Sequence, residues 1–148
     1  MSLSQIKSTV STIRPDTTLR EAARIMARDS VGALLISGEL HGPVEGIITD
    51  RDIVKEIGLG KDPGSATVSD FFGRFVATIS ENSSRREVTN KMKVHGVRRL
   101  PVVNAKGDVL GIVSMDDLLV EMGIEMSDVG RAIHAEFQHE APTPDSDE

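Results

Sequence analysis

Two seven-residue segments, 46–52 and 111–117, contain a glycine, two aliphatic residues, a hydroxyl residue and an aspartate in the same order. The hydroxyl and carboxyl side chains are Thr49 and Asp52 in the first segment, and Ser114 and Asp117 in the second. An ionised carboxylate accepts charge-assisted hydrogen bonds, which are roughly twice as strong as neutral ones, and glycine allows a close approach to the backbone. A helix that starts within the segment adds free N–H groups that favour anions. The pattern predicts contacts to a polar, anionic ligand.

The same spacing also fits a purely structural role. A hydroxyl residue followed three positions later by an acidic one is close to a capping box, in which the two side chains satisfy backbone N–H groups at the start of a helix. Either segment alone is no more specific than such a cap. The duplication favours ligand contact, and one residue can serve both roles.

Two adjacent arginines, Arg98 and Arg99, distinguish the second half of the chain from the first. The matching positions, 66 residues earlier, are Gly32 and Ala33. A guanidinium group donates two parallel hydrogen bonds to a phosphate, so the pair indicates a site for a phosphate-bearing ligand. The alternative is that the arginines are solvated or pair with an acid such as Asp116.

Three other groups of polar residues have simpler explanations than catalysis or metal binding. The acids at 50, 52, 116 and 117 could hold Mg²⁺, but adjacent acids at a helix start are favoured by the helix dipole. Lys61 lacks the glycine and hydroxyl spacing of a Walker motif. His134 and His139 are five positions apart, which places them poorly for one face of a helix. We expect no metal site and no catalysis.

The candidate residues lie within two copies of one unit. The residues that recur in identical form 66 positions later include Thr12, Ile13, Arg20, Glu21, Met26, Val31 and Leu34. In the first copy the patterns predict a strand at 12–13, a helix, strands at 33–36 and 44–48, and a short helix at 50–57. Leu19, Ala22, Ala23 and Met26 would share one face of the first helix. Capping boxes are expected at Thr18 with Glu21 and at Ser84 with Glu87.

The sequence therefore predicts an α+β fold of two β-α-β-β-α repeats. We assign residues 1–57 to the first repeat, 58–66 to a linker, 67–123 to the second repeat, and 124–148 to a C-terminal helix and an acidic, disordered tail. About 60 residues bury little core alone, and each repeat has one apolar sheet face to cover. We expect the sheets to pack face to face with pseudo-twofold symmetry and a cleft between the halves.

Composition argues against several classes of function. The chain has 148 residues, no Cys, Trp or Tyr and 4 Phe, so disulfides, thiol chemistry and aromatic surfaces for RNA are not expected. The formal net charge is −6, most of it in the C-terminal tail, which argues against nucleic-acid binding. No apolar run is long enough to span a membrane, and the N-terminus lacks the apolar segment of a signal peptide. We expect a cytoplasmic protein.

The unit resembles a cystathionine-β-synthase (CBS) domain, and the pair resembles a Bateman module. The resemblance rests on the extended start at 12–13, the capped helix containing Met26 or Met92, the strand at 99–103 and the duplicated glycine segment. It implies a regulatory ligand bound in the cleft: AMP, ADP or ATP, and less often NAD or S-adenosylmethionine. It also implies frequent homodimers, no catalysis and no catalytic cofactor.

The resemblance assigns roles to individual residues. The segment aspartate would contact ribose hydroxyls, the hydroxyl and basic residues would contact phosphate, and aliphatic side chains would enclose the adenine. We expect the main pocket to contain Ser114, Asp117, Arg98 and Arg99, closed by Val31, Gly32 and Ala33. A weaker pocket is expected around Thr49 and Asp52. The resemblance also places Ser11 and Ala77, on the opening strands, near the adenine.

We therefore predict a stand-alone regulatory module that senses adenine nucleotides and passes the signal to an unidentified effector protein. That partner would dock on an expected helix at 127–137, where Val129, Ile133 and Phe137 share one side. The alternative is a dimerisation or interaction module with degenerate pockets and no physiological nucleotide.

Overall fold

Each repeat forms a three-stranded sheet in the computed structural model, which describes residues 3, 7–39 and 42–140. In the first sheet β1 (Thr12–Ile13) pairs in parallel with β2 (Ala33–Ile36), which pairs antiparallel with β3 (Gly46–Thr49). In the second sheet β4 (Ile79–Ser80), β5 (Arg99–Val103) and β6 (Val109–Ser114) repeat this topology. The predicted α+β architecture of two similar repeats is confirmed.

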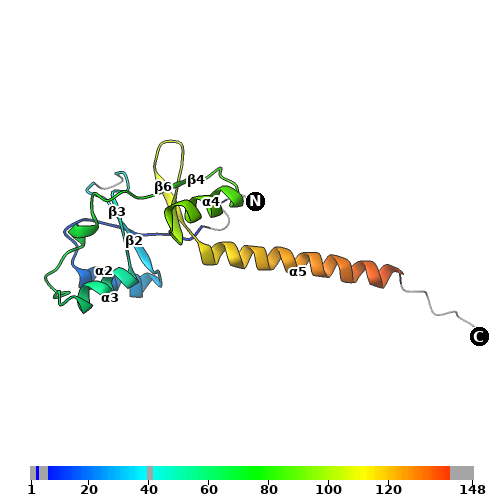
Figure 1. Cartoon of the computed structure of the whole chain (residues 1–148), viewed down its shortest axis with the longest axis horizontal. Coiled ribbons are helices and arrows are strands. Elements are labelled where there is room, and N and C mark those ends of the chain that lie inside the picture. Colours follow the sequence, from blue (N-terminus) through cyan, green and yellow to red (C-terminus); the bar gives the residue numbers. More distant parts are fainter. Residues whose placement is uncertain (1–2, 4–6, 40–41, 141–148) are drawn as a thin grey trace, which may run out of the picture.

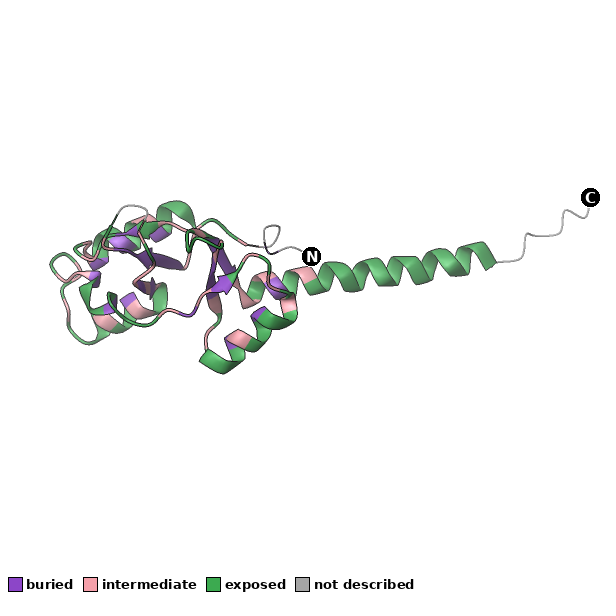
Figure 2. Cartoon of the chain, turned by 90° about the horizontal axis from the view of Figure 1, so that it is seen from above, coloured by how far each residue is buried: buried purple, intermediate pink, exposed green. Residues whose placement is uncertain are grey.

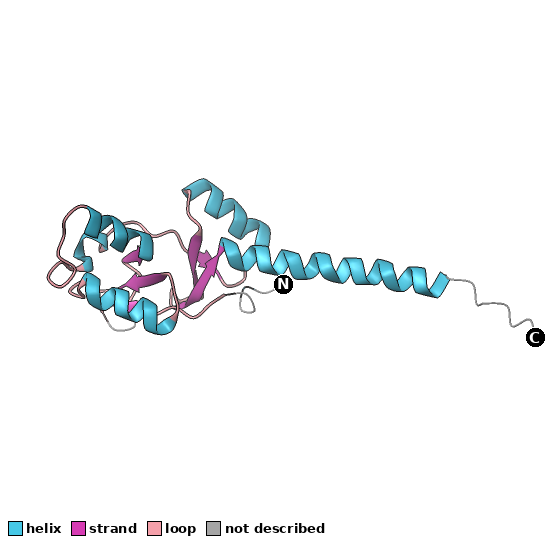
Figure 3. Ribbon diagram, turned by 90° about the horizontal axis from the view of Figure 1, so that it is seen from below, coloured by secondary structure: helices cyan, strands magenta, loops and turns pink. Residues whose placement is uncertain are grey.

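The helices lie on the outside of the strands (Figure 3). The first repeat contains α2 (Leu19–Asp29) and α3 (Asp50–Gly58), followed by the short 3₁₀ helix η1 (Val68–Phe71). The second repeat contains α4 (Arg85–His95) and the start of α5 (Met115–Glu140). Helix α5 continues far beyond the body that the two sheets form (Figure 1).

The first helix of each repeat begins with a hydroxyl cap. Ser84 and Glu87 form the complete capping box expected at the start of α4. At the start of α2 the Thr18 hydroxyl accepts from the N–H of Glu21 at 3.1 Å. The Glu21 carboxylate lies 3.7 Å from Arg24, as an exposed ion pair one turn further along the helix. The structure therefore shows the hydroxyl half of the predicted box at Thr18.

Each repeat has its own apolar core between its helices and its sheet. In the first core, Leu19, Ala22 and Met26 of α2 are buried against the sheet, but Ala23 is exposed. The prediction that Ala23 shares this face is wrong, because it lies one position beyond the buried stripe and Ile25 packs against the core instead. In the second core, Val88 and Met92 of α4 are buried as expected.

The two sheets face each other. All four residues of β2 are buried, so both faces of the first sheet are covered. Leu34 and Ile36 belong to the core beneath the helices. Successive side chains in a strand point to opposite faces, so Ala33 and Leu35 point away from that core, and Ala33 lines a cleft together with Ile112 of β6. This is the packing that the sequence predicts for two units with one open sheet face each.

The segment that opens each repeat packs on the other repeat. Val68 and Phe71, which follow the linker, lie in the first core, and Leu3 lies in the second. Each opening segment also forms an isolated antiparallel β-bridge with the sheet of the other repeat, Ser8 with Ile112 and Phe72 with Gly46. We call these two the exchanged segments. Residues on either side of the predicted linker, 58–66, therefore pack into the core of the other repeat. The predicted domain boundaries describe the sequence repeat and stay a prediction.

This exchange explains the glycine in each duplicated segment. A side chain at Gly46 would place a Cβ 2.2 Å from the carbonyl oxygen of Phe71, and one at Gly111 would place it 2.6 Å from the carbonyl oxygen of Ser8. Real Cβ contacts do not come this close to backbone. In each case the backbone of the other repeat's opening segment occupies the space, so the glycines are required by packing between the repeats.

Helix α5 is a single helix of 26 residues. The sequence suggests a short helix at 116–122 and a second at 127–137, but the helix runs through Gly123 without a break. Every residue from Met122 to Glu140 is exposed, as the green part of Figure 2 shows. The tail predicted to be disordered, 141–148, lies outside the described residues.

Candidate functional site

Two clefts between the repeats contain most of the predicted site residues. The Ser114 cleft, of about 200 Å³, is lined by Ser8, Thr9, Val10, Ser30, Val31, Gly32, Ala33, Arg99, Ile112, Ser114, Asp116 and Asp117. The Thr49 cleft, of about 260 Å³, is lined by Ile47, Thr49, Phe75, Val76, Ala77, Val97, Arg98, Arg99 and Pro101. Residues 31–33 of the Ser114 cleft and residues 97–99 of the Thr49 cleft occupy equivalent positions in the two repeats. The clefts are pseudo-symmetric versions of one site.

Arg99 is the residue that the two clefts share. It pairs with Ser114 across β5 and β6, in the place that Ala33 takes opposite Thr49 in the first sheet. Its guanidinium group crosses to the first repeat, where Nη2 lies 2.9 Å from the position of a Cβ on Gly32. Asp50 Oδ2 lies 3.3 Å from the same position. The Arg99 guanidinium group therefore occupies the space that a side chain at position 32 would take.

Arg98 lines the Thr49 cleft, and its side chain also reaches Asp116, which lines the Ser114 cleft. Its Nη2 lies 3.5 Å from Asp116 Oδ1, and both side chains are more than two-thirds exposed. Exposed pairs of this kind contribute about 0–1 kcal/mol, so the contact with Asp116 leaves the guanidinium available to a ligand. Ser114, Asp117 and Arg99 line one cleft together with residues 31–33, as the sequence predicts. The Thr49 cleft is lined by both Arg98 and Arg99.

Both hydroxyl–aspartate pairs form capping boxes. Asp52 Oδ2 accepts from the N–H and the hydroxyl of Thr49, each at 2.9 Å, and the Asp52 N–H donates to Thr49 Oγ1 at 3.2 Å. In the second segment Asp117 Oδ2 accepts from the Ser114 N–H at 2.8 Å, and the Asp117 N–H donates to Ser114 Oγ at 3.1 Å. The structural alternative is thus realised in both copies. Within the described residues these bonds use only Oδ2 of each carboxylate.

The two residues expected near an adenine differ in their surroundings. Ala77 lines the Thr49 cleft. Ser11 does not line either cleft, and its hydroxyl donates to Asp29 at 3.1 Å. Hydrogen bonds from Arg28 and then from Ser11 lower the pKa of the Asp29 carboxyl. Asp52 is also absent from the cleft lining, because its carboxylate turns back to cap α3.

Sequence reasoning missed the residues just before these positions. Thr9 and Val10 line the Ser114 cleft, and their counterparts Phe75 and Val76 line the Thr49 cleft. Phe75 is 82% exposed, and its ring centroid lies 5.7 Å from that of His95. The 66-residue offset that relates Ser11 to Ala77 could have predicted these residues. The extended chain next to Ser11 and Ala77 borders the same two clefts.

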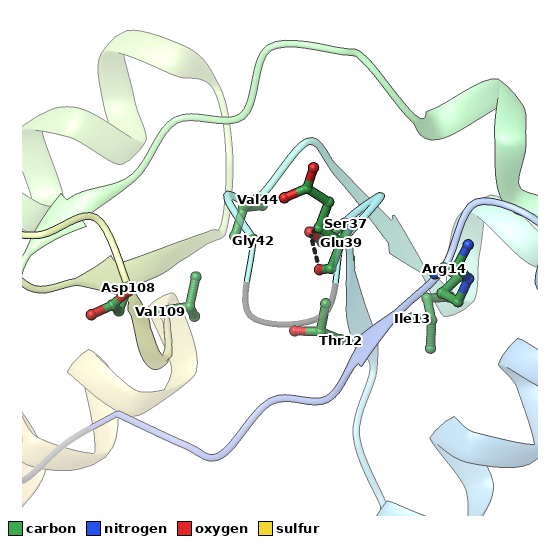
Figure 4. A pocket seen from close by; sticks show the side chains of 9 residues that line it. All are labelled: Thr12, Ile13, Arg14, Ser37, Glu39, Gly42, Val44, Asp108 and Val109. Atoms are coloured by element: carbon green, nitrogen blue, oxygen red, sulfur yellow. Dashed lines mark hydrogen bonds between the residues drawn. The ribbon is translucent and has the colours of Figure 1, made fainter.

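A third cavity, of about 360 Å³, lies at the hairpin ends of the two sheets. Figure 4 shows Asp108 and Val109 from the second repeat on one side, and Ser37 and Val44 from the first on the other. The Ser37 hydroxyl donates to the carbonyl oxygen of Glu39 at 2.9 Å. None of the residues predicted to bind a ligand lines this cavity.

No three His, Asp or Glu side chains of residues 3, 7–39 and 42–140 come together as a group that could hold a metal ion. None of the helices in these ranges has the length and apolar character needed to cross a membrane.

The chain belongs to the CBS domain family. The family model for the CBS domain matches it twice, at residues 3–59 and 68–123. An uncharacterised protein of Methanopyrus kandleri is 37% identical over 106 residues, which are 71% of this chain and 54% of that protein. The chain thus spans about half the length of this relative. Hypoxic response protein 1 of Mycobacterium tuberculosis is 37% identical over 68% of this chain and 70% of its own length.

Solved structures of CBS proteins share the fold. The crystal structure of Hypoxic Response Protein I with two coordinated zinc ions has a TM-score of 0.68 at 33% identity, covering 80% of this chain and 97% of its own. The CBS domain pair of the protein MJ0100, in complex with 5′-methylthioadenosine and S-adenosylmethionine, has a TM-score of 0.74 at 28% identity. It covers 84% of this chain and 98% of its own. The protein described here is a tandem CBS pair.

Proposed function

We propose that the chain is a regulatory module that binds an adenosine-containing ligand in the clefts between its repeats. The observation that carries the proposal is the position of Arg99, which lines both clefts. A ligand in either cleft would contact this side chain, and a ligand shifts the arrangement of two halves only through contacts that differ between their states. The MJ0100 complex with 5′-methylthioadenosine and S-adenosylmethionine supports this class of ligand.

A phosphate-bearing nucleotide fits the Thr49 cleft better than the Ser114 cleft. The residues that line the Thr49 cleft include Arg98 and Arg99 and no acid. Those of the Ser114 cleft include Arg99 but also Asp116 and Asp117. A phosphate would gain two guanidinium donors in the first cleft and would face two carboxylates in the second. This proposal reverses the preference for the Ser114 pocket that the sequence suggests.

An adenosine ligand without phosphate, or one with a positive charge, fits the Ser114 cleft. The Oδ1 atom of Asp117 is left over by the capping box and can accept from ribose hydroxyls. S-adenosylmethionine carries a sulfonium cation, and the acids at 116 and 117 favour it. Val31 and Ile112 offer the aliphatic walls for an adenine, as Ile47, Val97 and Pro101 do in the other cleft.

A thermal-shift panel tests the binding directly. The full chain is melted with AMP, ATP, NAD, 5′-methylthioadenosine and S-adenosylmethionine, each over a concentration series. A ligand that binds only the folded state adds about 2.7 kcal/mol at 100 times its dissociation constant. We expect AMP or ATP and at least one phosphate-free adenosine ligand to raise the melting temperature. No shift with any ligand, on a sample that melts cooperatively, would reject the proposal.

A second candidate function is an interaction module without a physiological nucleotide. The observation that favours it is that both hydroxyl–aspartate pairs are complete capping boxes, which explains these residues without a ligand. The thermal-shift panel separates the two candidates. The arginines at 98 and 99 favour the first, because helix capping does not require them.

The relatives described above have names that refer to CBS domains or to no activity, and we propose no reaction for this chain. Transmission of the signal to an effector protein, the formation of a homodimer and a cytoplasmic location stay predictions from the sequence.

A further inference from the structure

The projecting part of α5 carries a continuous stripe of exposed apolar side chains. They follow one another at intervals of three or four residues, and between 49% and 72% of each is exposed: Leu119, Met122, Met126, Val129, Ile133 and Phe137. Residues at these intervals lie on one side of a helix. None of the residues that the structure describes covers this side beyond the body of the protein (Figure 2).

The helix needs a packing partner to be stable over this length. Its last ionic contact with the body is the pair of Arg85 and Glu125, at 2.8 Å, and residues 126–140 continue beyond it. Helices of this length are marginal in water without packing of an amphipathic face. Gly123 and Gly130 weaken the helix further, because glycine is a poor helix former.

The stripe has the spacing of a coiled-coil seam. From Leu119 to Ile133 the apolar residues alternate at intervals of three and four, which is the a and d pattern of two-stranded coiled coils. Gly123 and Gly130 lie seven residues apart, next to the seam, where the absence of a side chain allows a second helix to approach closely. We propose that a second copy of this chain covers the stripe and that the two α5 helices pack antiparallel.

The charges on α5 favour the antiparallel orientation. Its first half, 115–127, contains four acids and no base, and its second half contains three acids and Arg131, the helix's one Lys or Arg residue. Arg131 lies seven residues after Ile124, on the side away from the seam, but an antiparallel pair still separates the two more acidic halves, whereas a parallel pair places them together. In a parallel pair Glu136, at a seam position, would also face its own copy. In an antiparallel pair it faces Leu119 at the end of the seam.

A second copy suits the stripe better than the C-terminal tail of the same chain. Residues 141–148 contain no Leu, Ile, Val, Met or Phe, so they have no side chain that would fill the seam. Antiparallel pairing instead places Met122 opposite Ile133 and Met126 opposite Val129, so that both helices supply matching apolar residues. The seam is only about 27 Å long, shorter than a standard interface of about 800 Å² per partner needs. The association should therefore depend on concentration.

Sedimentation velocity of the full chain tests the dimer. Over about 1 to 100 μM, we expect wild type to shift from monomer to dimer and Met126→Glu to remain monomeric. Ile124→Glu is the matched control, because Ile124 is 52% exposed on the opposite side of the same helix, and it should behave as wild type. Circular dichroism verifies that each variant is folded. A monomeric wild type, or a dimer that Met126→Glu leaves intact, overturns the proposal, and so does dissociation by Ile124→Glu alone.

Disulfide cross-linking tests the orientation, since the natural chain has no cysteine. The variants Met122→Cys and Ile133→Cys are oxidised separately and as a mixture. Antiparallel helices predict a cross-link in the mixture and little in either variant alone. Cross-linking of each variant with itself would indicate parallel helices and would overturn the orientation. A stripe that binds a different protein while this chain stays monomeric would overturn the proposal as a whole.

Discussion

Gly46 and Gly111 illustrate how a residue can suggest a ligand and serve a structural purpose. At the sequence level both glycines fit a backbone that approaches a ligand. In the structure the backbone of Phe71 or Ser8 takes that place. The aspartates behave similarly, because each caps a helix with Oδ2 of its carboxylate. Single residues of this segment therefore identify the fold more firmly than the function.

Gly46→Ala should destabilise the protein strongly. The new Cβ would lie 2.2 Å from a backbone oxygen, and overpacking of this kind costs about 3 kcal/mol. Gly58→Ala is the control, because nothing lies within 4 Å of its Cβ position. Urea unfolding followed by circular dichroism measures both. Equal midpoints for the two variants would contradict the close approach of the exchanged segment.

Ser30→Gly should stabilise the protein. Ser30 follows α2 with a left-handed φ of 53°, and its counterpart in the second repeat is Gly96 with φ of 63°. A left-handed conformation costs a residue with a side chain about 1 kcal/mol. The reciprocal change, Gly96→Ser, should lower the free energy of unfolding by a similar amount. If both variants unfolded at the same urea concentration as wild type, the strain at Ser30 would be absent.

At the scale of the element, the sequence was sufficient for the sheets and insufficient for α5. Apolar runs and helical apolar spacing, repeated in both halves, predicted the strands and the α-helices of the body, but not the short 3₁₀ helix η1. The sequence predicts two separate helices here, at 116–122 and 127–137, whereas α5 is continuous from Met115 to Glu140. A helix that extends from the body has no buried face to set its length, so spacing alone did not reveal that the two segments join.

The capping box of α4 makes a prediction about pH. The Ser84 N–H, which donates to Glu87 Oε2 at 2.6 Å, and the Ser84 hydroxyl lower the pKa of the Glu87 carboxyl below its ordinary 4.5. Because the pKa is lower in the folded state, ionised Glu87 adds to the free energy of unfolding above pH 4.5. This contribution is lost as the pH falls through the folded-state pKa. Glu87→Gln should remove that part of the acid sensitivity. Melting temperatures of both proteins between pH 7 and pH 3 measure it, and parallel curves would contradict the role of Glu87.

At the scale of the whole molecule, the repeat explains why the site could be predicted in part. The 66-residue offset located both clefts and the segments 31–33 and 97–99 that border them. It could not tell which cleft each arginine enters, because that depends on how the sheets face each other. Arg98 precedes β5 and Arg99 begins it, and only Arg99 lines both clefts. The exchange of opening segments was also invisible, since it is a long-range contact without a local pattern.

The two clefts are proposed to select different ligands, because their lining side chains differ in charge. Isothermal titration with AMP and with 5′-methylthioadenosine, on wild type, Arg98→Ala and Asp117→Asn, tests it most directly. We predict that Arg98→Ala weakens AMP binding about tenfold, since hydrogen bonds to charged groups contribute about 1.5–3 kcal/mol, and leaves 5′-methylthioadenosine unchanged. Asp117→Asn keeps a capping acceptor and should weaken only 5′-methylthioadenosine. Loss of AMP binding in Asp117→Asn, with full AMP affinity in Arg98→Ala, would contradict the assignment of phosphate to the Thr49 cleft.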